Sequence, residues 1–332
     1  MKKIFLIVGI FITISFSVFY SLNRDKKPIE VKCDKNLAAF DIGSGTTKLK
    51  IVKVNVCEKK FIKVLSYMTM PVPYAQDLKE NNGKFSAAIQ NYGAEVIGRY
   101  VRASKSFNVD KILGVATSAF RKSSNGKELI KKWNKKFSVD FRVIDQREEA
   151  LIGYDSVRLH DSHEYAVWDI GGGSMQVVEN SDGKPFIYLG NIASVTFKNK
   201  LMKKLKIDGS SPNPVDRKVF DYAVNLSIEL FSEELRVNKL KKFSPGFKFV
   251  GIGGLHKSLL PKNQDYYTFE NLEERATRFI GKTDAEINSK YSDTMVTNIA
   301  LIMGFMKLFD ISKIHVSDVV LSDGLIYQEL IY

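Results

Sequence analysis

Hydrophobic and polar positions along the chain follow two different periods. Short apolar runs bounded by glycine or polar residues predict strands, at 37–42, 48–56, 111–117, 141–144, 166–170, 175–178 and 247–252. Longer segments with apolar residues three and four positions apart predict helices, at 85–107, 124–133, 148–159, 194–205, 215–235, 294–309 and 322–330. Strands that alternate with helices are typical of the α/β class.

Two strand–turn–strand units share one sequence pattern. The first reads FDIGSGTTK, with Asp41 at the end of its first strand, and the second reads WDIGGGSMQ, with Asp169 at the equivalent position. Each unit opens a segment of alternating strands and helices. We therefore expect two related lobes, and a chain of 332 residues is long enough for about two domains.

Both turns contain residue types that bind phosphate. Glycine lets the backbone approach a phosphate and aim amide N–H groups at it, and hydroxyls at Ser44, Thr46 and Ser174 can add hydrogen bonds. An aspartate at the strand end can hold a divalent cation. Glycine in a plain hairpin is the simpler explanation of either turn alone. Two such turns, 128 residues apart at Asp41 and Asp169, favour phosphate binding.

Two further segments carry candidate chemistry. In ATSAFRKSSNG, Arg121 offers a planar fork for phosphate oxygens just before a helix start; a surface arginine beside a capped helix is the alternative. In VIDQREEALIGY, Glu148 and Glu149 begin a helix. One carboxylate there can deprotonate a water, although acidic residues are also favoured in a first helical turn by the macrodipole.

The N-terminus, residues 1–27, is predicted to be a signal peptide or an uncleaved signal anchor. Lys2 and Lys3 precede nineteen uncharged residues, 4–22, and Arg24, Lys26 and Lys27 follow. Either alternative exports the rest of the chain. We therefore expect a location in the bacterial periplasm or at the outer face of the inner membrane.

The two cysteines lie twelve residues on either side of Gly45, in the first predicted hairpin. Paired strands would place Cys33 and Cys57 close to opposite one another. Because export permits disulfides, a Cys33–Cys57 bridge is one expectation, and two unrelated thiols are the other.

Charge narrows the class of partner. The chain has 50 basic and 37 acidic residues, a net charge of +13, of which residues 1–27 contribute +4. Such a balance suggests nucleic acid, an anionic membrane or a polyanionic substrate. No nucleic-acid motif accompanies it, so no specific nucleic-acid partner is expected. Lysine clusters at 131–136, 198–206 and 239–242 are either solvated helix faces or a track for a polyanion.

The motifs, taken in order, resemble the exopolyphosphatase/guanosine pentaphosphate phosphohydrolase (Ppx/GppA) family of the actin-like ATPase superfamily. The matching segments are AAFDIGSGTTKLKIV, GVATSAFRKSSNG, VIDQREEALIGY, VWDIGGGSMQVV, ASVTF, VGIGG and LSDGLIYQEL. The resemblance implies two actin-like (ribonuclease H-like) lobes with a central cleft. We place the first lobe at 28–160 and the second at 161–317, with the closing helix, 318–332, returning to the first.

The resemblance also implies roles for individual residues. Glu149 matches the catalytic acid–base residue and Arg121 the family arginine, while Asp169, together with Asp41, would hold Mg²⁺ or Mn²⁺. The phosphate-cradling positions are Gly43, Ser44, Gly45, Thr46, Gly171, Gly172, Gly173 and Ser174.

Several positions depart from the family pattern. Gly45 stands where asparagine is usual, Gln176 replaces a carboxylate that can help bind the cation, and Asp145 adds negative charge before the glutamates. We therefore expect weakened or redirected activity, and a degenerate binding protein is an alternative.

The predicted function is that of an exported, Mg²⁺-dependent exopolyphosphatase, a phosphoric anhydride hydrolase that releases terminal phosphate from polyphosphate. Alternatives are hydrolysis of guanosine pentaphosphate or other nucleoside polyphosphates, and non-catalytic sensing of polyphosphate or a nucleotide. An ATP-driven actin-like or sugar-kinase relative fits the segment from Ala116 to Glu149 less well. Expected partners are a polyanionic phosphate substrate, a membrane through an uncleaved leader, and a second copy in a homodimer.

Overall fold

The computed structural model describes residues 32–159, 165–181, 184–237, 243 and 248–332. The predicted leader, 1–27, lies outside these residues. Within them, none of the helices is long and apolar enough to cross a membrane.

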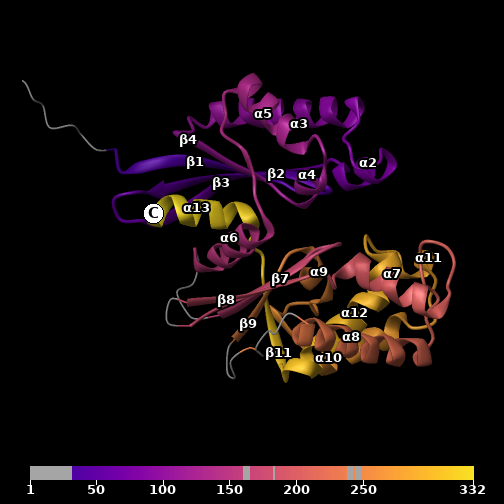
Figure 1. Cartoon of the computed structure of the whole chain (residues 1–332). Helices are drawn as coiled ribbons and strands as arrows, with labels where there is room; N and C mark the ends of the chain where they lie inside the picture. Colours follow the sequence, from indigo (N-terminus) through magenta and orange to yellow (C-terminus); the bar gives the residue numbers. More distant parts are fainter. Residues whose placement is uncertain (1–31, 160–164, 182–183, 238–242, 244–247) are drawn as a thin grey trace, which may run out of the picture.

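The first lobe is built on a five-stranded sheet with the order β3-β2-β1-β4-β5 (Figure 1). Its strands are β1 (Asp34–Ile42), β2 (Thr46–Asn55), β3 (Lys60–Pro71), β4 (Lys111–Ala116) and β5 (Arg142–Val143). The first three form antiparallel hairpins, whereas β4 pairs parallel with both β1 and β5. A parallel partner requires a crossover, and the helices of the lobe supply it.

Alternate residues of β1 build the two cores of this lobe. Ala38 and Phe40 face a core shared with helices on one side of the sheet, and Leu37 and Ala39 face a second core on the other side. This is the period-2 alternation of a strand buried on both faces. The helices of the first core are α2 (Tyr74–Glu80), α3 (Ala87–Ser106), α4 (Ser118–Lys122) and α5 (Gly126–Phe137), and those of the second are α6 (Gln146–Arg158) and α13 (Leu321–Ile331).

The second lobe repeats this plan. Its sheet has the order β10-β11-β9-β6-β7-β8, with β6 (Tyr165–Ile170), β7 (Met175–Ser181), β8 (Lys184–Gly190), β9 (Lys248–Ile252), β10 (Tyr266–Thr268) and β11 (Lys313–Ser317). Strands β6, β7 and β8 are antiparallel, and β9 is parallel to β6 and β11. The pairing of β6 thus matches that of β1, and the expected α/β class with two related lobes is confirmed.

One helix of the second lobe, α12 (Met295–Phe309), is buried along most of its length. Its Phe305 ring stacks on Trp168 of β6 with centroids 3.9 Å apart. The remaining helices are α7 (Ser194–Leu205), α8 (Arg217–Val237), α9 (Gly254–Leu259), α10 (Phe269–Phe279) and α11 (Asp284–Ile287). The residue next to Trp168 is Asp169, so this packing supports the predicted site.

The sequence analysis did not predict four of the strands, β3, β8, β10 and β11. Strands β3, β8 and β10 lie at the edges of their sheets, where one side chain in two need not be apolar. Strand β8 nevertheless contains a short apolar run at 186–189 that the sequence analysis did not use. Strand β11 is short and carries charged or polar residues at Lys313, His315 and Ser317.

The closing helix packs against the first lobe. Helix α13 lies on α6 and on β1, and the Lys50 Nζ of β2 lies 2.6 Å from a carboxylate oxygen of Asp323 in α13. Asp323 is fully buried. A Cβ added to Gly324 would lie 1.8 Å from the Ile152 carbonyl oxygen of α6, so only glycine permits this approach of the two helices.

We expect Gly324→Ala to lower the free energy of unfolding by about 3 kcal/mol, because the atom it meets is backbone and cannot rotate away. Chemical denaturation measures the effect. Gly45→Ala is the matched control, since a Cβ there meets nothing within 4 Å. Equal stability of the two variants would contradict the close helix approach.

The hairpin register differs by one residue from the symmetric arrangement about Gly45. Asp34 pairs with Asn55, so the centre of the hairpin lies between Ser44 and Gly45. Cys33 therefore lies beside the strand end rather than directly opposite Cys57. The two sulfurs are nevertheless bonded in the structure, with a Cα–Cα distance of 5.2 Å.

We expect Cys33→Ser to lower the free energy of unfolding by about 3 kcal/mol, because the bridge closes a loop with a sequence separation of 24. Denaturation of the oxidised wild type, the reduced wild type and the variant measures this. The reduced wild type should match the variant, and a variant as stable as the oxidised protein would show that the bridge does not form in solution.

Candidate active site between the two lobes

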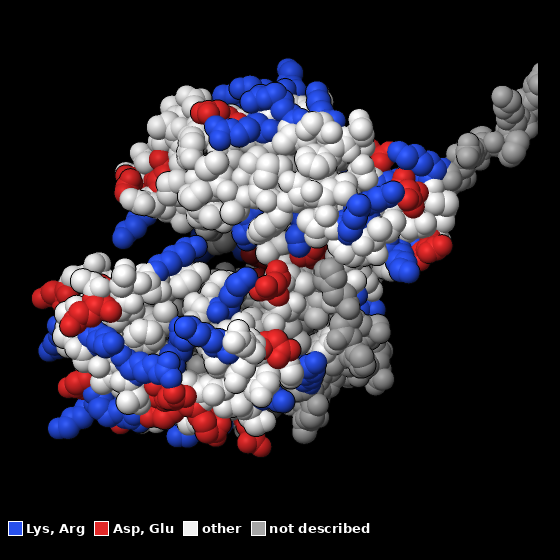
Figure 2. Space-filling model, turned by 180° about the vertical axis from the view of Figure 1, so that it is seen from behind, with Lys and Arg blue, Asp and Glu red and all other residues white. Residues whose placement is uncertain are grey.

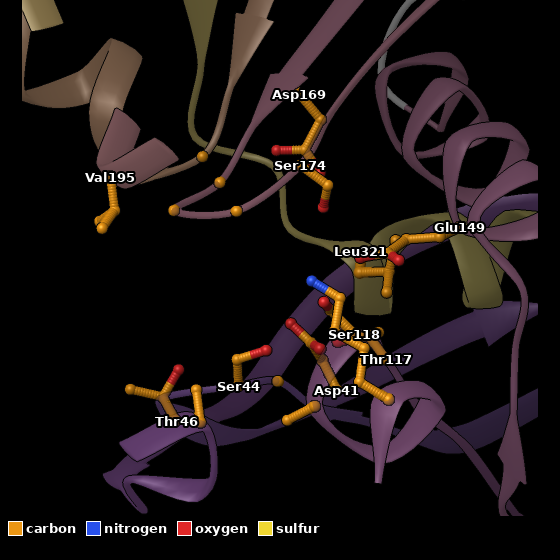
Figure 3. A pocket seen from close by; sticks show the side chains of 18 of the residues that line it. Asp41, Ser44, Thr46, Thr117, Ser118, Glu149, Asp169, Ser174, Val195 and Leu321 are labelled. Atoms are coloured by element: carbon orange, nitrogen blue, oxygen red, sulfur yellow. The ribbon is translucent and has the colours of Figure 1, made fainter. Parts of the chain in front are cut away.

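A cavity of about 640 Å³ lies between the lobes. Both glycine turns line it, together with the start of α4, the first turn of α6, the start of α7 and the segment that leads into α13. Figure 3 shows Asp41, Ser44 and Thr46 on one side and Asp169 and Ser174 on the other. Figure 2 shows the hollow between the lobes, with basic side chains on both rims.

Hydrogen bonds within the first lobe occupy the carbonyls of the first turn. The Gly43 N–H donates to the Thr46 carbonyl at 2.9 Å, and the carbonyls of Ser44 and Gly45 accept from amides in the segment 72–75. Among the described residues, the amides of Ser44 and Gly45 have no acceptor. Free N–H groups in a turn whose carbonyls are already bonded form an anion-binding concavity.

The second turn repeats this arrangement with different partners. The Gly171 N–H donates to the Ser174 carbonyl at 3.0 Å, and the carbonyls of Gly171 and Gly172 accept from the first amides of α7. In the part of the chain that the structure describes, the amides of Gly172, Gly173 and Ser174 have no acceptor. The two turns therefore present similar sets of donors to one cavity.

Three carboxylates reach the same cavity from different elements. Asp41 and Asp169 are the penultimate residues of β1 and β6, and Glu149 lies in the first turn of α6. Burial, with the neighbouring Glu149 and Asp41, raises the pKa of Asp169 to about 7. Burial also raises the pKa of Glu149, and Arg121 opposes that rise. The site thus has an excess of buried negative charge.

The carboxylates fit a divalent cation held partly by substrate. In the described residues, no three His, Cys, Asp or Glu side chains are grouped closely enough to form a complete metal site. Asp41 is also occupied by Lys48, whose Nζ lies 2.9 Å from its carboxylate. Mg²⁺ commonly takes one or two carboxylates and completes its shell with water and substrate phosphate oxygens. The raised pKa of Asp169 indicates that the protein does not compensate the charge of this buried carboxylate, so the position suits such a cation.

The fork of Arg121 does not line the cavity, contrary to the expectation of a phosphate fork. Its Nη1 lies 2.8 Å from Glu149 Oε2 and donates to the Ile144 carbonyl at 2.8 Å. Adjacent helical residues diverge by about 100°, so Lys122 faces the cavity instead. Arg121 thus holds Glu149 in place.

Most other predicted site residues line the cavity. Gly43, Ser44, Thr46 and the whole second turn, 171–174, do so, whereas Gly45 does not. Thr117, Ser118, Lys48 and Lys122 were not predicted as site residues. The hydroxyl-rich ATSAFRK segment contained the signal for three of them.

The unusual residues Asp145 and Gln176 have structural partners outside the cavity. Asp145 caps α6 and accepts from the Glu148 amide at 2.8 Å. The negative charge that Asp145 adds before the glutamates therefore caps the helix and does not line the cavity. Gln176 is buried and pairs with Asp169 across the β6–β7 ladder.

The lysine clusters do not form one continuous track among the described residues. Lys198 is buried and binds Asp293 and the Ser210 carbonyl, both at 2.6 Å. The lysines of α5 are exposed on the outer side of the first lobe, away from the cavity (Figure 1). Lys239, Lys241 and Lys242 lie outside the described residues.

Two lobes of duplicated topology, with facing Asp–Gly turns across a cleft, define an actin-like fold with a candidate phosphate site. Comparison with known families makes this specific: residues 51–204 match the model of the Ppx/GppA phosphatase family. This match confirms the resemblance drawn from the motifs and supports a phosphoanhydride hydrolase.

Solved structures agree on the fold. The Ppx/GppA family member of Aquifex aeolicus is similar, with 18% identity and a TM-score of 0.74 over 90% of this chain and 98% of that chain. An exopolyphosphatase from Cytophaga hutchinsonii has 19% identity and a TM-score of 0.67 over 89% of this chain and 98% of that chain. No curated protein matched the chain by sequence.

A buried histidine packs beside β6, the strand that carries Asp169. His256 packs edge-on against Trp168 with centroids 4.9 Å apart, and its Nδ1 lies 2.7 Å from the Tyr267 hydroxyl. Burial lowers the pKa of His256 to about 3. The imidazole is therefore neutral in the folded protein at neutral pH.

We expect the free energy of unfolding to fall as the pH drops below about 6.5, the ordinary pKa of a histidine side chain. The unfolded chain then binds a proton at His256 that the folded chain refuses down to about pH 3. This one group lowers the free energy of unfolding by up to about 1.4 kcal/mol per pH unit. Denaturation series of wild type and His256→Gln between pH 4 and 8 measure the two slopes, and parallel curves would contradict the buried neutral imidazole.

Proposed function

We propose that the protein is an exported, Mg²⁺-dependent phosphohydrolase that releases terminal phosphate from polyphosphate. The observation that carries this proposal is the pair of facing turns with free amides, 43–46 and 171–174, with the buried carboxylate of Glu149 beside them. Phosphoryl transfer to water requires positioned donors and positive charge, and little covalent work by the protein.

Glu149 is the proposed general base. Its raised pKa makes the carboxylate a better proton acceptor, while the ion pair with Arg121 fixes its orientation. The attacking water gives a proton to Glu149 as its oxygen bonds to the terminal phosphorus, and the bridging P–O bond breaks toward the remaining chain. Mg²⁺ held by Asp169 would neutralise charge on the phosphates.

The lining of the cavity favours a substrate made of phosphate alone. Among the described lining residues there is no aromatic side chain on which a base could stack. Guanosine pentaphosphate remains the second candidate, because Leu78, Val195 and Leu321 offer apolar surface beside the turns. The net charge of +9 outside residues 1–27 suits either polyanion.

Export is part of the proposal and has two supports. The sequence has nineteen uncharged residues, 4–22, between basic flanks. The Cys33–Cys57 disulfide suits an oxidising compartment such as the periplasm.

We expect Glu149→Gln to lower kcat for phosphate release from polyphosphate by about 10²- to 10⁴-fold, because the amide cannot accept the proton. Glu148→Gln is the matched control, because the Glu148 carboxylate pairs with the exposed Arg142 and does not line the cavity. Full activity of Glu149→Gln would overturn the assignment of the base.

The same assay separates the remaining alternatives. Polyphosphate and guanosine pentaphosphate are compared side by side, with Mg²⁺, with Mn²⁺ and with a chelator. Turnover that survives chelation would contradict the metal requirement. Tight binding without release, with every metal, would favour a sensor over an enzyme.

A further inference from the structure

Positive charge in the cavity is distributed unevenly. Two cationic side chains beside the carboxylates are neutralised within the chain, Lys48 by Asp41 at 2.9 Å and Arg121 by Glu149 at 2.8 Å. Lys122 also lines the cavity, and among the described residues no carboxylate lies within ion-pair distance of it.

Lys122 extends from the first lobe to the second. It ends α4 in the first lobe, and its Nζ lies 3.7 Å from the point that a Cβ on Gly173 would occupy. The amides of Gly172, Gly173 and Ser174 are the free donors of the second turn. The ammonium group of the first lobe thus lies close to the second turn, which carries these three amide donors.

We propose that Lys122 and the second turn together form a phosphate subsite that spans the two lobes, with Lys122 as its charged ligand. The proposal rests on the proposed function and specifies which groups hold one phosphate of the chain. An anion bound there would contact both lobes, because the Lys122 side chain comes from the first lobe and the amides come from the second.

Glycine at position 173 is part of this subsite. No contact closer than 3.7 Å would meet a Cβ there, and that contact is the Lys122 ammonium itself. A side chain at 173 would therefore occupy the space between the ammonium and the amides, where the proposal places the phosphate.

The test measures equilibrium binding of tripolyphosphate by calorimetry, without turnover, in the Glu149→Gln background of the full chain. We expect Lys122→Met to weaken binding by about 10- to 100-fold, as the loss of a charge-assisted hydrogen bond does. Lys122→Arg should restore most of the affinity, since it keeps the charge. Lys127→Met is the control, an exposed lysine of α5 outside the cavity.

A second readout is the salt dependence of binding. Loss of one direct phosphate contact should make the affinity of Lys122→Met less sensitive to ionic strength than that of Lys127→Met. Unchanged affinity in Lys122→Met, or an equal loss in both lysine variants, would overturn the subsite. Thermal unfolding of both variants should match that of the parent, because both lysines are exposed.

Binding and hydrolysis fail independently in this design. A protein that binds tripolyphosphate through Lys122 but releases no phosphate from any substrate would retain the subsite and lose the proposed function. A protein that hydrolyses polyphosphate equally well with and without Lys122 would retain the function and lose the subsite.

Discussion

The structure depends on how negative charge is held in a buried cleft. Asp41, Glu149 and Asp169 reach one cavity, and desolvation disfavours the ionised forms of Glu149 and Asp169. Lys48 neutralises the first and Arg121 the second, whereas Asp169 has a raised pKa. A site that is electrostatically incomplete in this way favours a cation and its phosphate ligand, which is the condition phosphoryl transfer needs.

Backbone geometry makes the same cleft attractive to anions. In both turns the carbonyls are bonded by a neighbouring segment, 72–75 in the first lobe and the start of α7 in the second. Among the described residues, the remaining amides have no acceptor within the chain. These bonds come from elements beyond the hairpins, so a glycine-rich turn becomes an anion site only after the lobe around it has folded.

Long-range packing places the remaining parts of the site. Helix α13 reaches the first lobe after the chain has completed the second, and Gly324 lets it approach α6, which carries Glu149. The Lys50–Asp323 pair joins the same helix to β2. The cavity wall at 319–321 therefore depends on contacts between segments that are far apart in sequence.

The sequence by itself determined the α/β class, the two turns and the identity of the three carboxylates, because glycine spacing and apolar periodicity are local properties. It also pointed to the cysteine pair, although the register shifted by one residue. Only the tertiary structure decided that Arg121 orients Glu149, that Asp145 caps a helix and that Lys122 faces the second turn. The physical reason is that a side chain's direction and its partner depend on helix phase and on the opposite lobe, neither of which a linear motif encodes.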